Sequence, residues 1–228
     1  VNPKRSHWNQ LPIYAYIIPI ALLMGAPILF ILSSAFKPLN ELFAYPPRFF
    51  VSQPTLTNFQ RLFLATAGTD VPLSRYVFNT VLVAVSSVAL TLLFGTMAAF
   101  ALSKMRFKQS KLIFETNNAA MMFVGTAVQI PSYLIITNLG ILNTYWAHIL
   151  PILASPVGMF LVKQFIDQVP DELIEAAQIE GAGALSIYRK IILPLVRPAV
   201  ATMAILASQI VLSNTVSSAL YVTDDGLY

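Results

Sequence analysis

Side chains that could do covalent or metal chemistry are scarce in this sequence. Cysteine is absent, which excludes disulfides and thiolate metal sites. The two histidines, His7 and His148, lie far apart and have no partners at metal-ligand spacing. The sequence also lacks a glycine-rich loop ending in Gly-Lys-Ser or Gly-Lys-Thr, the pattern that cradles nucleotide phosphates. We therefore predict that this chain has no catalytic residue and no metal site and binds no cofactor itself.

Polar side chains inside apolar runs offer hydrogen-bonding chemistry instead. An amide or hydroxyl in such a position can pair with the hydroxyl groups of a solute, which are costly to strip of water without replacement partners. It can also pair with a neighbouring helix, and for any one residue this is the commoner role. Gln129 and Asn214 are the favoured members of the candidate set for a solute pathway. That set is Asn79, Thr126, Gln129, Ser208 and Asn214.

The elements that must position these residues are membrane-spanning helices. Hydrophobic residues make up 57% of the 228 and charged residues only 11%, whereas soluble domains carry about 25% charged residues. Several charge-free stretches exceed the roughly 20 residues that cross a bilayer, and they are continuous rather than alternating, which favours helices over a barrel. We predict an all-α membrane protein, a polytopic helical bundle. Five spans are expected, at about 12–35, 77–103, 116–137, 145–166 and 196–222.

The basic residues predict which side of the membrane each segment faces. Positive residues gather on the cytoplasmic side of membrane proteins. If the N-terminus is cytoplasmic, the segment 167–195 is cytoplasmic and 36–76 is an external loop. Only four of the 14 Lys and Arg residues then lie outside: Lys37, Arg48, Arg61 and Arg75. Topology therefore accounts for the net charge of +4, and we expect contact with membrane lipid and not with nucleic acid.

The cytoplasmic segment carries the signals of two short helices. Pro170 suits a first helical position, and Asp171 and Glu172 suit the positive end of a helix. Gly181 suits a helix end or a sharp bend. We predict a helix after residue 170 and a second one that stops before Pro194. Helical spacing would give the first helix a shallow face able to insert into a groove of another protein, formed by Leu173, Ala176, Ala177 and Glu180.

The segment contains Glu175-Ala176-Ala177, then Gly181, then Ile191-x-Leu193-Pro194. At this spacing it resembles the EAA loop of ABC importer permeases, which in that family forms the coupling helices that dock into a cytoplasmic ATPase. An ordinary amphipathic helix with a glycine stop would explain Pro170 and Gly181, but not the alanine pair together with a distant Ile-x-Leu-Pro. The resemblance implies a set of ATPase-coupling residues: Glu175, Ala176, Ala177, Gly181, Ile191, Leu193 and Pro194.

Further segments resemble the carbohydrate-uptake branch of these permeases, of the maltose type. They are the stretches 34–43, 79–80, 101–107 and 140–146. Many members of that branch have an aromatic-Asn-x-aromatic pattern in the fifth span. Here the stretch Ser213-Asn214-Thr215-Val216 keeps only Asn214, so the sugar stays open. The family also has a sixth span at the C-terminus. Only five spans are predicted here, so we expect the sixth to be missing from this sequence.

The resemblance implies an ABC importer type I permease fold, with residues 1–228 forming a single transmembrane permease domain. It places the chain in a prokaryotic cytoplasmic (inner) membrane, with a second homologous permease subunit, two ATPase subunits that bind ATP and Mg, and an extracytoplasmic solute-binding protein. The implied function is the import of a sugar or oligosaccharide, coupled to ATP hydrolysis by the partner. The chain itself would not be an enzyme.

Two alternatives stay open. The first is an ABC permease for a non-sugar solute, such as a peptide or a phosphonate. The second is an ion-driven secondary transporter, a class that usually places ionisable residues inside the membrane. The interiors of the predicted spans carry no Asp, Glu, Lys or Arg, which argues against the second alternative.

Overall fold

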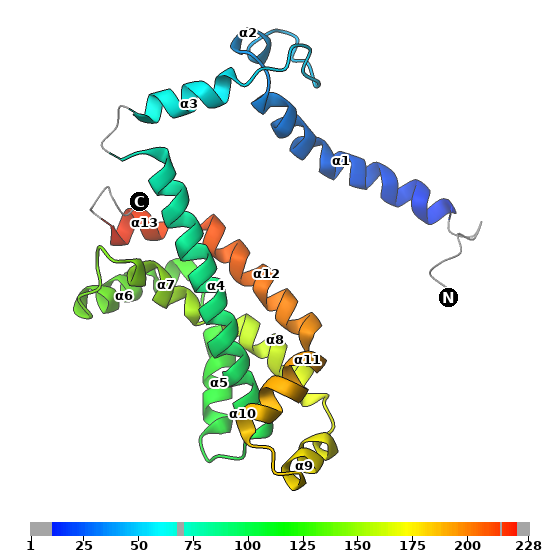
Figure 1. Cartoon of the computed structure of the whole chain (residues 1–228), viewed down its shortest axis with the longest axis vertical. Coiled ribbons are helices and arrows are strands. Elements are labelled where there is room, and N and C mark those ends of the chain that lie inside the picture. Colours follow the sequence, from blue (N-terminus) through cyan, green and yellow to red (C-terminus); the bar gives the residue numbers. More distant parts are fainter. Residues whose placement is uncertain (1–10, 68–70, 215, 223–228) are drawn as a thin grey trace. The chain divides into compact units, whose positions relative to one another are not determined.

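The computed structural model describes residues 11–67, 71–214 and 216–222, and within them the chain forms helices and turns with no strand. It divides into two compact units, Val1–Leu73 and Ser74–Tyr228, whose helices are labelled in Figure 1. Among the described residues, two helices are long and apolar enough to cross a membrane alone, and up to five segments are if each bent helix pair counts as one span.

The first unit consists of one long helix and two short ones. These are α1 (Leu11–Ala35), α2 (Leu39–Leu42) and α3 (Thr57–Ala67). No side chain in the apolar stretch of α1 is buried inside the structure. A helix that is apolar all round and uncovered needs lipid or another chain as its surroundings.

Side chains bonded to the backbone hold the connection between α1 and α3. Lys37 is only 2% exposed; its ammonium donates to the carbonyl of Arg48 and lies 4.8 Å from the ring centroid of Phe30. The Glu41 carboxylate accepts hydrogen bonds from the amides of Ser52, at 2.8 Å, and Gln53, at 3.4 Å. These bonds satisfy backbone groups that have no helical partner, and they give the segment after α1 a defined conformation.

The second unit is built around α4, whose 32 residues make it the longest of the described helices. The helices of this unit, in chain order, reach the last described residues. They are α4 (Leu73–Lys104), α5 (Ser110–Ala120), α6 (Gly125–Asn138), α7 (Tyr145–Leu153), α8 (Pro156–Asp167), α9 (Asp171–Ile179), α10 (Ala184–Ile187), the π-helix η2 (Tyr188–Ile192), α11 (Leu193–Leu195), α12 (Arg197–Ser213) and α13 (Val216–Tyr221).

The structure interrupts three of the helices expected to be continuous. In place of a helix at 116–137 there are two, α5 and α6, bent by 116° at a break. After α5, the amides of Met122 and Phe123 donate to the carbonyls of Ala119 and Ala120. Each bond reaches back three residues, as in a 3₁₀ turn. The run Met-Met-Phe-Val at this break is apolar throughout, so hydropathy alone does not mark it.

The other two interruptions have identifiable causes. At 145–166, α7 and α8 meet at 42°, where Ser155 caps α8 and Pro156 occupies its first turn. Proline lacks an N–H and clashes with a preceding helical turn, so a new helix starts there. At 196–222, α12 ends at Ser213, because Asn214 leaves the helical region with φ −88° and ψ 84°.

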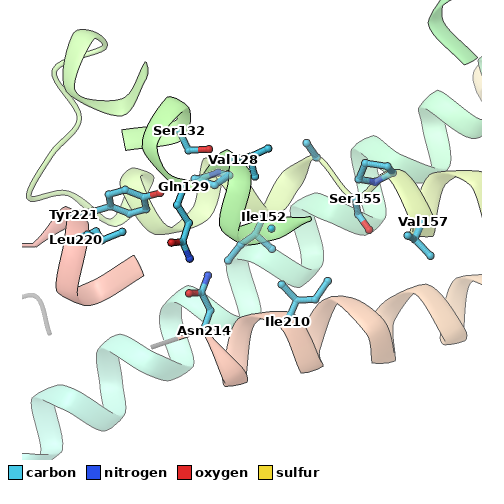
Figure 2. A pocket seen from close by; sticks show the side chains of 14 residues that line it. Val128, Gln129, Ser132, Ile152, Ser155, Val157, Ile210, Asn214, Leu220 and Tyr221 are labelled. Carbon is cyan, nitrogen blue, oxygen red and sulfur yellow. The ribbon is translucent and has the colours of Figure 1, made fainter. Parts of the chain in front are cut away.

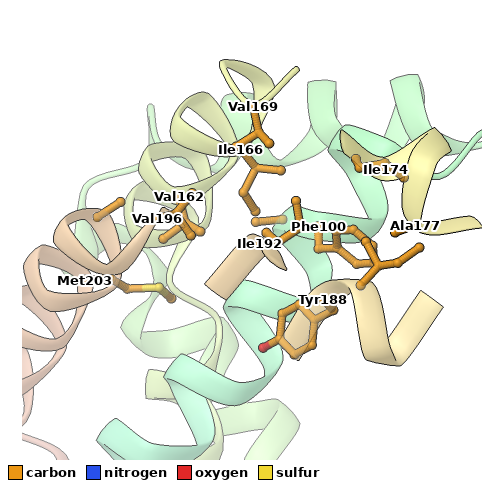
Figure 3. Packing of buried hydrophobic residues seen from close by; sticks show 13 residues of the cluster. Phe100, Val162, Ile166, Val169, Ile174, Ala177, Tyr188, Ile192, Val196 and Met203 are labelled. Atoms are coloured by element: carbon orange, nitrogen blue, oxygen red, sulfur yellow. The ribbon is translucent and has the colours of Figure 1, made fainter. Parts of the chain in front are cut away.

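One apolar core joins α4, α8, α9 and the segments up to α12 in this unit (Figure 3). Helix α8 packs against α12, and α5 packs against α8 with the Phe114 and Phe160 rings stacked at 5.9 Å. The buried members come from α4, from α8 through α9 with the turn between them, and from α10 through α12. They are Ala99, Phe100, Val162, Ile166, Val169, Ile174, Ala177, Ile187, Tyr188, Ile192, Val196, Ala199 and Met203.

Candidate functional site

A cavity of about 360 Å³ opens among α6, the α7–α8 break, the end of α12 and α13 (Figure 2). Such a volume falls within the range of small-molecule sites, which are mostly apolar with a few placed polar groups. The breaks in the helices create it, because each break turns side chains and backbone toward a shared space. The lining residues are Gly125, Val128, Gln129, Ser132, Pro151, Ile152, Ala154, Ser155, Pro156, Val157, Ile210, Asn214, Leu220 and Tyr221.

Two carboxamides point toward one another across this cavity. Figure 2 shows Gln129 reaching in from α6 and Asn214 from the end of α12. Each amide carries two donor hydrogens and an acceptor oxygen, so the pair can bind groups that both donate and accept, as hydroxyl groups do. The hydroxyls of Ser132 and Tyr221 also belong to the lining, whereas the Ser155 hydroxyl accepts from the amide of Gly158 at 3.3 Å.

The other three pathway candidates do not line the cavity. Asn79 is buried, and its side-chain oxygen accepts from the Tyr145 hydroxyl at 2.8 Å. Ser208 donates to the carbonyl of Ile205 in its own helix at 2.8 Å. Thr126 is exposed on α6. Of the five candidates, the structure brings together only Gln129 and Asn214.

Sequence reasoning missed Ser132, Ser155 and Tyr221 as lining residues. A signal existed for one of them, because Ser155-Pro156 is the N-cap and first-turn pair that starts a helix. That pair marked a break, and a break inside a span exposes polar backbone that must face a cavity or protein. Ser132 and Tyr221 carried no such signal.

The EAA-like segment forms α9, which begins at Asp171 after Pro170 and ends in a glycine turn. Gly181 has φ +82°. The Gly181 amide donates to the carbonyl of Gln178 at 3.0 Å, and the Ala182 amide donates to the carbonyl of Ala177 at 2.9 Å. This pair of bonds is the Schellman motif, which needs a left-handed residue at its glycine position. The expected helix start and glycine end are both present.

The expected face of α9 is wrong in one respect. Ala176 and Ala177 were placed on the same outward face, but Ala177 is only 8% exposed and packs into the core with Ile174. Ala176 and Glu175 are exposed instead. Leu173 and Ile179 are also exposed, at 46% and 88%. The small side chain of Ala177 allows one face of α9 to pack on the core. The opposite face, which is left uncovered, is therefore apolar and acidic.

The second helix of the segment does not stop before Pro194. It continues through η2 and α11, with Pro194 inside α11. Proline removes the donor of one i→i−4 bond, and the π-turn Tyr188–Ile192 immediately before it uses longer-range bonds that accommodate the loss. Ile191 and Leu193 pack against the buried core, and Pro194 is exposed.

Lys104, at the end of α4, contacts the start of α9. Its ammonium donates to Asp171 Oδ1 and to the carbonyl of Val169, both at 2.6 Å. This hydrogen bond and the positive charge hold the pKa of the Asp171 carboxyl below its ordinary value. In the sequence, Lys104 is one of the ten Lys and Arg residues predicted to lie on the cytoplasmic side, and this contact was not predicted.

The helices have the arrangement of the ABC importer type I permease fold. The structure resembles that of a bacterial ABC transporter involved in the import of the acidic polysaccharide alginate, with a TM-score of 0.78 and 21% identity over 99% of this chain and 79% of that one. The chain belongs to the family described as binding-protein-dependent transport system inner membrane component, whose model matches residues 17–228. The family and the fold expected from the sequence are thus confirmed.

Several curated relatives are named as sugar transport permeases. The sulfoquinovosyl glycerol transport system permease protein SmoH of Agrobacterium fabrum is 34% identical over 79% of this chain. The diacetylchitobiose uptake system permease protein NgcG of Streptomyces coelicolor is 32% identical over 84%. The arabinooligosaccharides transport system permease protein AraQ of Halalkalibacterium halodurans is 33% identical over 82%. The matches span 62% of the first two relatives and 66% of the third.

Proposed function

We propose that this chain is the permease subunit of a binding-protein-dependent ABC importer that carries a sugar or oligosaccharide across the cytoplasmic membrane. The observation that carries the proposal is the family match over residues 17–228, with sugar transport permeases among the relatives. The cavity supports the sugar class, because the opposed amides of Gln129 and Asn214 offer donors and acceptors to hydroxyl groups.

The proposed partners follow from that role. The complete importer would contain a second homologous permease, two ATPase subunits that bind ATP and Mg, and a solute-binding protein on the outer side. The N-terminus of this chain would be cytoplasmic, which puts α9 on the side of the ATPase. Its exposed Leu173, Ala176 and Ile179, among Glu172 and Glu175, then form the surface that the ATPase receives.

Coupling would work as a two-state change biased at a distant site. ATP binding closes the ATPase pair and displaces the segment 170–194, and the helices around the cavity change which side they open to. The chain itself hydrolyses nothing in this scheme. It supplies the solute path and the surface on which the ATPase acts.

An uptake experiment tests the proposal against its two alternatives. The assembled importer in proteoliposomes, with its binding protein outside and ATP inside, is offered labelled arabino-oligosaccharide and diacetylchitobiose, and a labelled peptide and phosphonate for comparison. We expect saccharide accumulation that orthovanadate abolishes. Accumulation of the peptide or phosphonate alone would favour a non-sugar ABC permease. Uptake that survives removal of ATP and stops with an uncoupler would favour an ion-driven carrier.

A further inference from the structure

The start of α9 is fastened to the end of α4 by one nearly buried ammonium. The Lys104 side chain is 8% exposed, and its Nζ reaches both Asp171 Oδ1 and the Val169 carbonyl at 2.6 Å. A charge removed from water is stable only when it is paired and hydrogen-bonded. Both partners of this charge belong to the chain that leads into α9, so the burial of Lys104 depends on α9 keeping its place.

Neighbouring polar contacts extend the attachment to the corner between α8 and α9. The Ser103 hydroxyl donates to Asp167, and Lys163 forms an ion pair with the same carboxylate at 2.8 Å. Consecutive residues of α4, Ser103 and Lys104, therefore contact both sides of the short turn 168–170. Asp167 is bound from α4 and from within α8.

On the side of α9 that does not face the core, an open space lies beside the end of α4. It is a cavity of about 400 Å³, lined by Ser103, Lys104 and Arg106 from the α4 side and by Asp171, Ile174, Glu175 and Gln178 from α9. The far end of α9 turns at Gly181. Helix α9 is thus attached to α4 at its first residue, packs on the core through Ile174 and Ala177, and ends in the turn at Gly181.

The same helix α4 carries buried polar contacts from the cytoplasmic end toward the solute cavity. Thr96 shares a 2.6 Å hydrogen bond with the Tyr188 hydroxyl, and Thr91 donates to the carbonyl of Ile152 at 3.4 Å. Ile152 lines the cavity that holds Gln129 and Asn214. From Lys104 to Thr91 is about 20 Å along a helix that rises about 1.5 Å per residue.

We propose that Lys104 is the positioning residue that makes α4 move with α9, so that a displacement of α9 reaches the solute cavity through α4 as well as through the chain that follows α9. This inference rests on the proposed function, because the displacement is the one an ATPase would impose. An ammonium that served only as a topology signal would remain in water. Lys104 instead joins two elements 67 residues apart in sequence.

Two measurements on the assembled importer test this role. The first is amide hydrogen exchange of residues 171–179, which reports whether α9 is held. The second is the number of saccharide molecules accumulated per ATP hydrolysed, with arabino-oligosaccharide or diacetylchitobiose as the probe. The variants are Lys104→Met, which removes the charge, and Lys104→Arg, which keeps it. Lys108→Met is the matched control, since Lys108 is an exposed residue of the basic run 104–111 that also contains Lys104.

We expect Lys104→Met to speed exchange across 171–179 about tenfold, as for the loss of a charge-assisted hydrogen bond. ATP hydrolysis should continue while the number of saccharide molecules accumulated per ATP falls. Lys104→Arg should restore most of the slow exchange and most of the transport per ATP. If Lys104→Met does not assemble, Asp171→Asn replaces it, because that change removes the ion pair and leaves the Val169 contact; a smaller change in the same direction is expected.

The outcomes separate this inference from the function on which it rests. Suppose the wild-type importer couples transport to ATP and the Lys104→Met or Asp171→Asn variant is coupled as tightly. This result would overturn the inference and leave the proposed function standing. Equal losses in Lys104→Met and Lys108→Met would also overturn it, because charge in the basic run would then be the cause. A wild-type assembly that accumulates neither saccharide nor any other solute at the expense of ATP would overturn the proposed function and the inference with it.

Discussion

Gly181 is the single residue whose backbone conformation closes α9. With φ +82° it lies in the left-handed region, and a side chain there would meet no atom within 4 Å. A substitution therefore strains the backbone without a clash, at about 1–2 kcal/mol for an L-residue. We predict that Gly181→Ala or Gly181→Leu leaves membrane insertion intact and lowers the saccharide transported per ATP hydrolysed in the reconstituted importer.

Gly183 supplies the control for that prediction. It also has open space around its would-be side chain, but its φ of −73° suits any residue. Gly183→Ala should therefore behave as wild type, and Gly181→Asn should be milder than Gly181→Ala because Asn tolerates the left-handed region. Full coupling in Gly181→Leu would contradict the role of this turn.

At the residue scale, the sequence predicts features whose cause is local. Pro170 and Gly181 mark the two ends of α9 because proline and glycine act on their own backbone. The contacts of Lys104 could not be predicted in this way. Its partners at 169 and 171 are distant in sequence, and only the packing of α4 beside α9 brings them together.

The crossing of α4, α8 and α12 depends on two glycines that make room for Met203. A Cβ added at Gly95 would lie 2.3 Å from Met203 Cε, and one at Gly158 would lie 2.8 Å from Ser155 Oγ and 2.9 Å from Met203 Cγ. The methyl end of Met203 can move aside, but Cγ is close to the backbone and cannot move as far. We predict that Gly158→Ala destabilises the chain by about 1–3 kcal/mol, as overpacking does, measured as thermal unfolding in detergent.

A double-mutant cycle tests the cause of that loss. If Met203 is the obstruction, Met203→Ala should cost less in the Gly158→Ala background than in wild type. Gly25→Ala in α1 is the control, because a Cβ there meets nothing within 4 Å. Additive effects of Gly158→Ala and Met203→Ala would rule out the predicted collision.

The π-turn is joined to α4 by one buried hydrogen bond. Tyr188, 5% exposed, bonds through its hydroxyl to Thr96 at 2.6 Å, and Thr96 keeps a second bond to the Leu92 carbonyl. We predict that Tyr188→Phe lowers the unfolding free energy by about 1 kcal/mol, since no buried partner is left unsatisfied. Tyr133→Phe, at a ring that stacks on Tyr221, is the control. No difference between the two variants in chemical denaturation would contradict the prediction.

At the element scale, hydropathy finds apolar stretches but not where they bend. The break before Pro156 had a local signal in Ser155-Pro156. The 116° bend between α5 and α6 had none, because its residues are apolar. That bend is set by packing: α5 lies along α8, with the Asn117 amide donating to the carbonyl of Pro156 at 3.2 Å.

At the scale of the whole molecule, composition and motif spacing predict the family and the fold class, but they do not predict the cavity lined by Gln129 and Asn214. The cavity is lined from four separate helical segments, and its two amides are 85 positions apart (214 − 129). Their polar character in an apolar run made them candidates. Their meeting depends on the break before Pro156, which has a local signal, and on how α6, α12 and α13 pack around it, which has none.

The geometry of this cavity separates the five pathway candidates. Gln129→Leu and Asn214→Leu remove the opposed amides but keep similar volume, so they should raise the KM for saccharide uptake about tenfold or more, as expected when hydroxyl groups lose their hydrogen-bond partners. Thr126→Val and Ser208→Ala, outside the cavity lining, should leave uptake unchanged. Asn79→Leu breaks a buried bond to Tyr145 and should lower thermal stability more than it changes KM.

Initial uptake rates over a range of saccharide concentrations, together with thermal unfolding of each variant, measure both effects. If Thr126→Val or Ser208→Ala raised the KM as much as the two amide variants, this cavity would not be the site at which the solute is recognised.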